Sequence, residues 1–306
     1  MQPALHIREP ALRFRGRFAL DLFLLARPWF WPVSLLPYYV GFVLATHRLT
    51  PAVAELPPLS LGAIVAGPLV WLAVLAVNDA HDLPGDRLNP RKAGSPLTSG
   101  RMSTATAARI AVVAAVTALG AAALVGTAFT IGTLLVLVLG WIYSVPPLRL
   151  KERPGADAAV NALAIGAIGP AAGWCAVESI GGFPWLFALQ GTLVGVALYL
   201  PTTLVDHAAD EALGYRTIAV RLGRRTTYRL GFAAWIAAAA LAAGLALADL
   251  TIPRHMFGFE LVMVPALIAA YHLLLARVQS FYRIAVVSGL FLIPSAVFVL
   301  TYTGRL

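Results

Sequence analysis

The sequence has little charge and almost no cysteine. Only 12% of its 306 residues are charged, against 59% that are hydrophobic, and its mean hydropathy is +0.80. This composition excludes a water-soluble domain, because too few polar side chains are present to cover its surface. The single cysteine, Cys175, lies inside an apolar run, so an intramolecular disulfide is excluded and Cys175 is interpreted as a small core residue. The sequence therefore predicts a polytopic membrane protein.

Long apolar runs make up most of the chain. A membrane-spanning helix needs about 20 apolar residues. Nine segments of about that size are predicted, at residues 22–46, 59–78, 104–124, 127–144, 157–178, 185–205, 229–248, 257–276 and 282–302. Eight helices are the alternative, because only a short link near Gly126 separates the third segment from the fourth. We expect an all-α integral membrane protein, with about nine transmembrane helices in one bundle and a single domain over residues 1–306.

Acidic residues are scarce, whereas 23 Lys and Arg residues give a net charge of +9. With nine helices, only Arg48, Arg254 and Arg305 fall on one side of the membrane, and the remaining Lys and Arg residues fall on the other. Because Lys and Arg concentrate in cytoplasmic loops, we expect the N-terminus on the cytoplasmic side. Residues 1–20 are interpreted as a basic cytoplasmic arm rather than a cleavable signal. Topology and anionic membrane lipid account for the positive charge, so no nucleic acid partner is predicted.

Five of the 14 acidic residues lie in two clusters, each directly after a long apolar run and on the basic side. The clusters read Asn78-Asp79-x-x-Asp82-x-x-x-Asp86 and Asp206-x-x-x-Asp210. They follow the second and sixth predicted helices, which indicates two four-helix pseudo-repeats plus a last helix. At helical spacing the carboxylates of each cluster would point together. Because such carboxylates repel one another and resist desolvation, we expect a cation to share them, and the two faces could form a magnesium cage around a diphosphate.

Other interpretations of these clusters are weaker. Solvated loops with capping aspartates would explain one cluster, but not two with related spacing on the same side. An ion-coupled transporter is disfavoured, because the aspartates lie at helix ends rather than in mid-span. His81 and His207 fall between the acidic positions and are predicted to face elsewhere.

The clusters resemble the two aspartate-rich motifs of the UbiA superfamily of intramembrane prenyltransferases. The loop from Tyr143 to Lys151 resembles a third family segment, and Thr217 and Gly223 continue the usual tail of the second motif. Helix number, motif order and cytoplasmic facing agree, so the resemblance covers nearly the whole chain. The stretch from Tyr143 to Asn161 looks more like lycopene elongases and chlorophyll synthases than like hydroxybenzoate enzymes.

The resemblance implies an Mg2+-dependent enzyme that transfers an isoprenyl group from an allylic polyprenyl diphosphate to a lipophilic acceptor, such as a quinone precursor or a carotenoid, with release of diphosphate. The implied catalytic residues and Mg2+ ligands are Asp79, Asp82, Asp86, Asp206 and Asp210. The predicted substrate-binding residues are Asn78, Arg91, Lys92, Tyr143, Arg149, Lys151 and Tyr199. Metal and basic side chains would stabilise the departing diphosphate, and aromatic faces would stabilise the carbocation. A terpene cyclase that uses no external acceptor is the main alternative, and a ribosyl-donor branch of the superfamily also exists.

Structural roles are predicted for several other residues. Arg27 precedes Pro28 and is interpreted as a side chain that snorkels to the headgroups, rather than a residue at the active-site mouth. Asp157 is interpreted as a favourable charge in the first turn of a helix. The pairs Gly169-x-x-x-Gly173 and Gly191-x-x-x-Gly195 are predicted to form close helix-packing faces.

Overall fold

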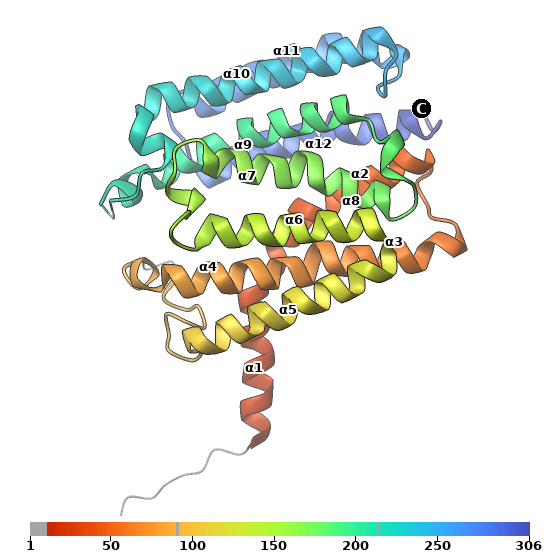
Figure 1. Ribbon diagram of the computed structural model, residues 1–306. Coiled ribbons are helices and arrows are strands. Elements are labelled where there is room, and N and C mark those ends of the chain that lie inside the picture. Colours follow the sequence, from red (N-terminus) through yellow and green to blue (C-terminus); the bar gives the residue numbers. More distant parts are fainter. Residues whose placement is uncertain (1–10, 90–91, 213) are drawn as a thin grey trace, which may run out of the picture.

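The structure, a computed structural model, describes residues 11–89, 92–212 and 214–306, with side chains from residue 17 onward. Within these ranges every regular element is a helix, and nine segments are long and apolar enough to cross a membrane. The helices pack side by side in one bundle (Figure 1). The α-helices are α1 (Ala11–Ala26), α2 (Trp31–Thr46), α3 (Leu56–Ile64), α4 (Val70–Asp86), α5 (Thr104–Val125), α6 (Thr127–Ser144), α7 (Ala156–Leu163), α8 (Gly169–Cys175), α9 (Trp185–Ala212), α10 (Ile218–Ala248), α11 (Phe257–Leu275) and α12 (Phe281–Tyr302). The nine-helix prediction is confirmed, and Gly126 separates α5 from α6.

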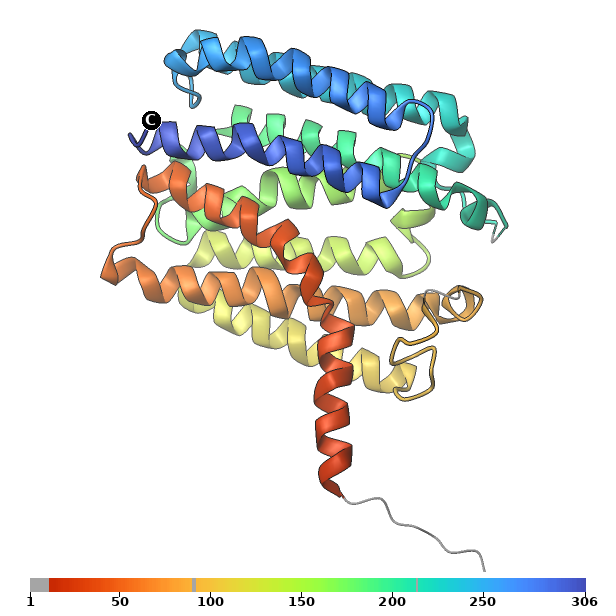
Figure 2. The same ribbon diagram turned by 180° about the vertical axis from the view of Figure 1, so that it is seen from behind.

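The first predicted span is broken into two helices. Residues 22–46 were expected to form one helix, but the chain breaks at Arg27, whose φ is 45°. Proline has no N–H to donate and disfavours helical geometry at the preceding residue, so Pro28 ends α1 and starts a new turn. Figures 1 and 2 show α1 running across the direction of the bundle helices. The first helix aligned with the bundle is therefore α2 alone.

Two of the spans are composite. A π-helical turn, Val65–Leu69, joins α3 to α4, and another, Ala164–Ile168, joins α7 to α8. Pro68 lies inside the first turn, and Pro170 is the second residue after the other turn. Proline removes a backbone donor, and a widened turn accommodates the missing hydrogen bond. Both turns contribute residues to the main cavity of the bundle, so they position its walls.

Small residues bring the helices close together. A Cβ atom added at Gly173 in α8 would lie 1.7 Å from the carbonyl oxygen of Tyr38 in α2. A Cβ atom at Gly191 in α9 would lie 2.7 Å from the carbonyl oxygen of Gly166, and one at Gly195 would lie 2.9 Å from the Cα of Ala162. Backbones at these crossings touch directly, as small residues permit in membrane bundles. The predicted packing role of both glycine pairs is confirmed.

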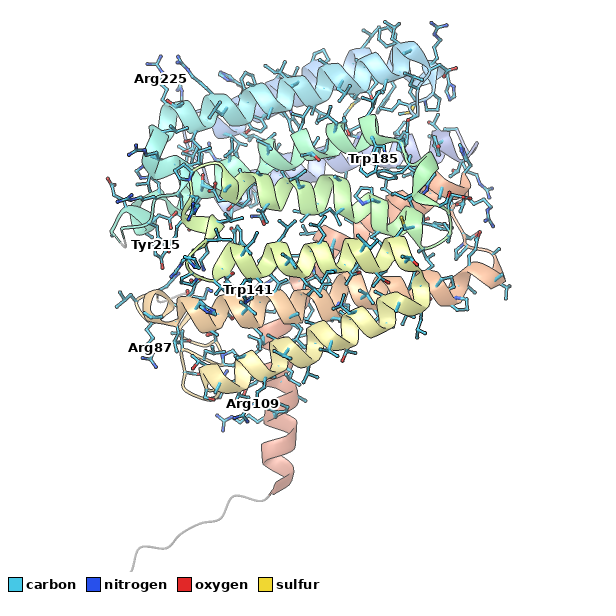
Figure 3. All side chains as sticks on the ribbon, viewed as in Figure 1. Arg87, Arg109, Trp141, Trp185, Tyr215 and Arg225 are labelled. Carbon is cyan, nitrogen blue, oxygen red and sulfur yellow. The ribbon has the colours of Figure 1, made fainter. Side chains whose placement is uncertain are left out.

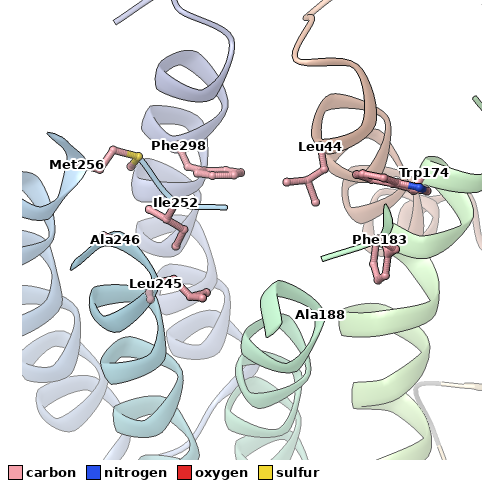
Figure 4. Close-up of a cluster of buried hydrophobic side chains, with 10 residues drawn as sticks. Leu44, Trp174, Phe183, Ala188, Leu245, Ala246, Ile252, Met256 and Phe298 are labelled. Atoms are coloured by element: carbon pink, nitrogen blue, oxygen red, sulfur yellow. The ribbon is translucent and has the colours of Figure 1, made fainter. Parts of the chain in front are cut away.

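A cluster of buried apolar side chains packs several helix ends against one another, on the side away from the acidic clusters. Leu44, Trp174, Phe183, Met256 and Phe298 meet there, from segments far apart in the sequence (Figure 4). The rings of Trp174 and Phe183 are 5.8 Å apart in an edge-to-face arrangement, which aromatic pairs favour. This packing leaves the polar chemistry concentrated at the opposite end.

Candidate active site

A cavity of about 500 Å³ lies inside the bundle. Its walls come from α4, α6, α9 and the composite α7–α8 span, and it has one polar and one apolar end. Lining residues on α6 run from Phe129 to Tyr143, which corresponds to ~21 Å at 1.5 Å per residue. The cavity is therefore long enough to hold an apolar chain with a polar headgroup at one end.

Both acidic clusters contribute to the polar end of this cavity. They lie on the last turns of α4 and α9, and Asp82, Asp206 and Asp210 line the cavity. Asn78 lines it too, and its Nδ2 donates a hydrogen bond to Ser144 Oγ at 3.2 Å. Segments 124 residues apart thus deliver carboxylates to one site.

The other two carboxylates of the first cluster lie off the cavity lining. Asp79 is only 3% exposed and forms an ion pair with Arg27, while Lys92 Nζ lies 3.6 Å from Asp79 and 3.0 Å from Asp86. At 3.6 residues per turn, position 82 lies about 60° from position 79 and about 40° from position 86, so the different basic partners, rather than helical spacing, divide these carboxylates. The expected single face of three aspartates is therefore split into two.

Basic residues neutralise both halves of the first cluster. Lys151 forms an ion pair with Asp82, and Arg149 Nη2 lies 3.1 Å from the same carboxylate. The Arg149 guanidinium also lies over the ring of Tyr215, 5.9 Å from its centroid. Burial lowers the pKa of the Lys151 ammonium below its usual value, and the neighbouring Asp82 opposes this shift. Of the predicted basic contacts, Arg91 lies outside the described residues.

The interpretation of Arg27 as a snorkelling side chain is wrong. Its guanidinium is 16% exposed and donates to Asp79 on α4. The break before Pro28 turns α1 away from the bundle and leaves Arg27 at the junction, beside the first acidic cluster. The sequence signal that could have indicated this position is Pro28 directly after Arg27, because proline favours a helix break at the preceding residue.

Two tyrosines predicted at the site face each other across the cavity. The hydroxyl oxygens of Tyr143 on α6 and Tyr199 on α9 are 3.2 Å apart, and Asn161 Nδ2 donates to Tyr143 at 3.3 Å. All three line the cavity. Asp157 lies in the first turn of α7, as predicted, where it is fully buried and accepts a hydrogen bond from the Gly155 N–H at 3.0 Å.

Two residues near α10 line the cavity beside the second acidic cluster, and one residue of the first cluster's helix faces away. Thr217, directly before α10, donates a hydrogen bond to Asp210 Oδ2 at 3.2 Å and lines the cavity with Tyr215. His81 is exposed and its Nδ1 lies 2.9 Å from the Val77 carbonyl oxygen, so it faces away from the cavity as predicted. Asn161 of α7 and Tyr215 were missed as site residues, and Arg27 was given another role, because the sequence does not encode which segments meet in the folded bundle.

The oxygen-rich lining fits magnesium at an open site. Within the described ranges, no group of three or more His, Cys, Asp or Glu side chains is gathered as a ready-made metal cluster. Magnesium usually takes one or two protein carboxylates and completes its shell with water and substrate phosphate. Asp82, Asp206 and Asp210, at one end of a single cavity, therefore match magnesium held together with a phosphate ligand better than a closed cage of five carboxylates.

Comparison with known proteins identifies the family. The UbiA prenyltransferase family matches residues 34–286, which is most of the chain. The chain belongs to the UbiA prenyltransferase family. A lycopene elongase/hydratase from Halobacterium salinarum is 29% identical over 81% of this chain and 84% of its own length. A second protein of that name, from Haloferax volcanii, is 28% identical over 71% of this chain and 70% of its own length.

Solved structures of this family share the fold. A UbiA homolog from Archaeoglobus fulgidus, bound to GPP and Mg2+, superposes with a TM-score of 0.70 at 22% identity, covering 92% of this chain and 98% of the homolog. The structure of a digeranylgeranylglyceryl phosphate synthase superposes with a TM-score of 0.71 at 14% identity, covering 94% and 98%. This UbiA-family protein is thus an intramembrane prenyltransferase by family, built on the helical bundle of these structures.

Proposed function

We propose that this protein transfers an isoprenyl group from an allylic diphosphate to a lipophilic acceptor in an Mg2+-dependent reaction. The observation that carries the proposal is the single cavity with carboxylates of both acidic clusters at one end and ~21 Å of largely apolar wall behind them. A diphosphate headgroup fits the polar end and an isoprenyl chain fits the rest. The A. fulgidus homolog bound to GPP and Mg2+ supports a prenyl diphosphate donor and Mg2+ as the ligands of this protein.

The leaving group is held at the polar end. Asp82, Asp206 and Asp210 would hold Mg2+, which when bound supplies positive charge to the departing diphosphate. Arg149 and Lys151 are already beside Asp82, and their N–H groups can donate to phosphate oxygens left uncovered by metal. The buried pairing of Asp79 with Arg27 holds a further cation against this end of the bundle.

The cavity walls protect the carbocation that forms when the diphosphate leaves. Tyr143 and Tyr199 lie between the carboxylates and the apolar lining, where their ring faces can stabilise positive charge. Aliphatic walls along α6, such as Val136 and Leu139, exclude water that would otherwise capture the cation. The cation therefore persists until the acceptor's nucleophilic carbon reaches it.

The acceptor is proposed to be a carotenoid-type polyene. This assignment rests on the relatives named lycopene elongase/hydratase, two of which align with more than two thirds of the chain. We also propose that the polar end faces the cytoplasm, because most Lys and Arg residues gather at that end of the bundle. Figure 3 shows Arg87, Arg109 and Arg225 there, with Trp185 toward the opposite end.

A donor and acceptor panel tests the proposal. The purified protein is given geranyl, farnesyl or geranylgeranyl diphosphate, with and without Mg2+ and with and without lycopene, and diphosphate and lipid products are measured. We expect Mg2+-dependent diphosphate release that requires lycopene and adds one isoprenyl group to its mass. Release with a cyclic or hydroxylated isoprenoid and no acceptor would identify a terpene cyclase instead. Release that occurs only with a different lipophilic acceptor would refute the carotenoid assignment alone.

A further inference from the structure

A second concavity, of about 380 Å³, lies between α1, α4 and α5, apart from the main cavity. Phe18 and Leu22 of α1, Leu72 of α4 and Val113 of α5 form apolar walls. We call this concavity the α1 groove. The two sets of lining residues have no member in common, so the α1 groove is separate from the main cavity.

One charge lines the α1 groove. Arg109 is the single ionisable side chain among the lining residues, and it lies little more than one turn into α5. It is exposed, and no carboxylate within the described parts of the chain pairs with it. The neighbouring Arg101, by contrast, pairs with Asp21 of α1 at 2.8 Å. Arg109 is thus a cation at an apolar groove, available to an anion from outside the protein.

The surroundings of the groove place it against lipid. α5 is one of the spanning helices, and Arg109 is near the end that carries the acidic clusters. α1 crosses the bundle direction there and exposes Phe18, Leu20 and Phe23, each at 44% or more. An exposed apolar face on a helix that runs across the direction of the spanning helices is typical of a helix at the membrane interface. The groove is therefore at headgroup depth, with its apolar part toward the acyl chains.

We propose that the α1 groove binds an anionic phospholipid. The Arg109 guanidinium donates to the phosphate oxygens, and an acyl chain lies along the α5 face from Val113 toward Thr117, ~12 Å from Arg109. The bound lipid packs against α1, which ends at Ala26, directly before the Arg27 that pairs with Asp79. The lipid thereby braces the helix that delivers Arg27 to the active site.

The contact between Arg109 and the lipid headgroup can be tested by a binding measurement that does not depend on enzymatic turnover. The detergent-purified protein is titrated with phosphatidylglycerol or phosphatidylcholine, and bound lipid is counted by native mass spectrometry. Arg109→Gln should weaken phosphatidylglycerol binding about fivefold and leave phosphatidylcholine unchanged, because one basic contact to anionic lipid is lost. Arg225→Gln is the matched control, since Arg225 is exposed at the same end, away from the groove, and pairs with no carboxylate among the residues that the structure describes. Equal binding by Arg109→Gln and the control would overturn the proposal.

The acyl-chain contact is tested by filling the groove. Val113 lines it and is 65% exposed, whereas Val116 is 64% exposed on the same helix and does not line it. Val113→Trp should lose the tightly bound phosphatidylglycerol, and Val116→Trp should retain it. Thermal unfolding of both variants checks that they fold. Retention in folded Val113→Trp, or equal retention of both lipids by the unmodified protein, would refute an anionic phospholipid in this groove.

Discussion

The ion pair between Arg27 and Asp79 makes a quantitative prediction about stability. Asp79 is 3% exposed, so Arg27→Gln leaves a buried carboxylate without its main partner. Removing one partner of a buried ion pair typically costs roughly 3–5 kcal/mol of folding free energy. Lys92 remains 3.6 Å from Asp79 and is itself partly exposed, so we expect a cost just below this range, about 2–3 kcal/mol.

An exposed ion pair supplies the matched control. Arg48 pairs with Glu55, but these side chains are 45% and 23% exposed. Such pairs contribute about 0–1 kcal/mol, so Arg48→Gln should change stability little. The measurement is thermal unfolding of the detergent-purified variants in Mg2+-free buffer, where no metal can replace the lost cation.

A double-mutant cycle isolates the interaction. In a background that already carries Asp79→Asn, the cost of Arg27→Gln should fall below about 1 kcal/mol, because no buried carboxylate remains to be stranded. If Arg27→Gln is no more destabilising than Arg48→Gln, or if its cost is the same in the Asp79→Asn background, the buried pairing does not stabilise the fold as described.

Four other substitutions test helix packing, the outward orientation of His81 and the length of the cavity. Gly173→Ala should destabilise the protein by about 1–3 kcal/mol in the unfolding assay, because the added Cβ would lie 1.7 Å from the Tyr38 carbonyl oxygen. At Gly120 an added Cβ would meet nothing within 4 Å, so Gly120→Ala should stabilise the protein by up to about 1 kcal/mol in the same assay. His81→Ala should leave turnover nearly unchanged, and a large loss of kcat would contradict its outward orientation. Phe129→Ala should raise kcat/KM for geranylgeranyl relative to geranyl diphosphate by about tenfold, because it enlarges the apolar end of the cavity; an unchanged ratio would mean that the donor chain does not reach that end.

Much of the fold was predictable, because each membrane-spanning helix needs a run of about 20 apolar residues. Apolar length alone located nine spans, and the positions of the two acidic clusters placed them at the ends of the second and sixth. Hydropathy does not reveal where a helix changes direction, however. The apolar run continues from α1 through Pro28 into α2, so the turn at Arg27 was hidden within what was predicted as one helix.

The site was predictable in its residue types but not in its arrangement. Helical spacing alone grouped Asp79 with Asp82, although their side chains reach different partners in the folded bundle. Which partners they reach depends on the loop that carries Arg149 and Lys151 and on the break at Arg27, and both are tertiary features. The π-helical turns that shape the cavity also carry no clear local signal beyond an adjacent proline.

The most direct test of the account is diphosphate release by variants of both acidic clusters. Asp82→Asn and Asp206→Asn change single carboxylates that line one cavity but lie on α4 and α9, and His81→Ala is the control on α4. Each is assayed with geranylgeranyl diphosphate, Mg2+ and the acceptor that the unmodified protein uses. The account predicts that both aspartate variants remain folded and lose at least about a hundredfold in kcat, while the control keeps its activity. Near-normal release by either folded aspartate variant would contradict a shared site built from both clusters.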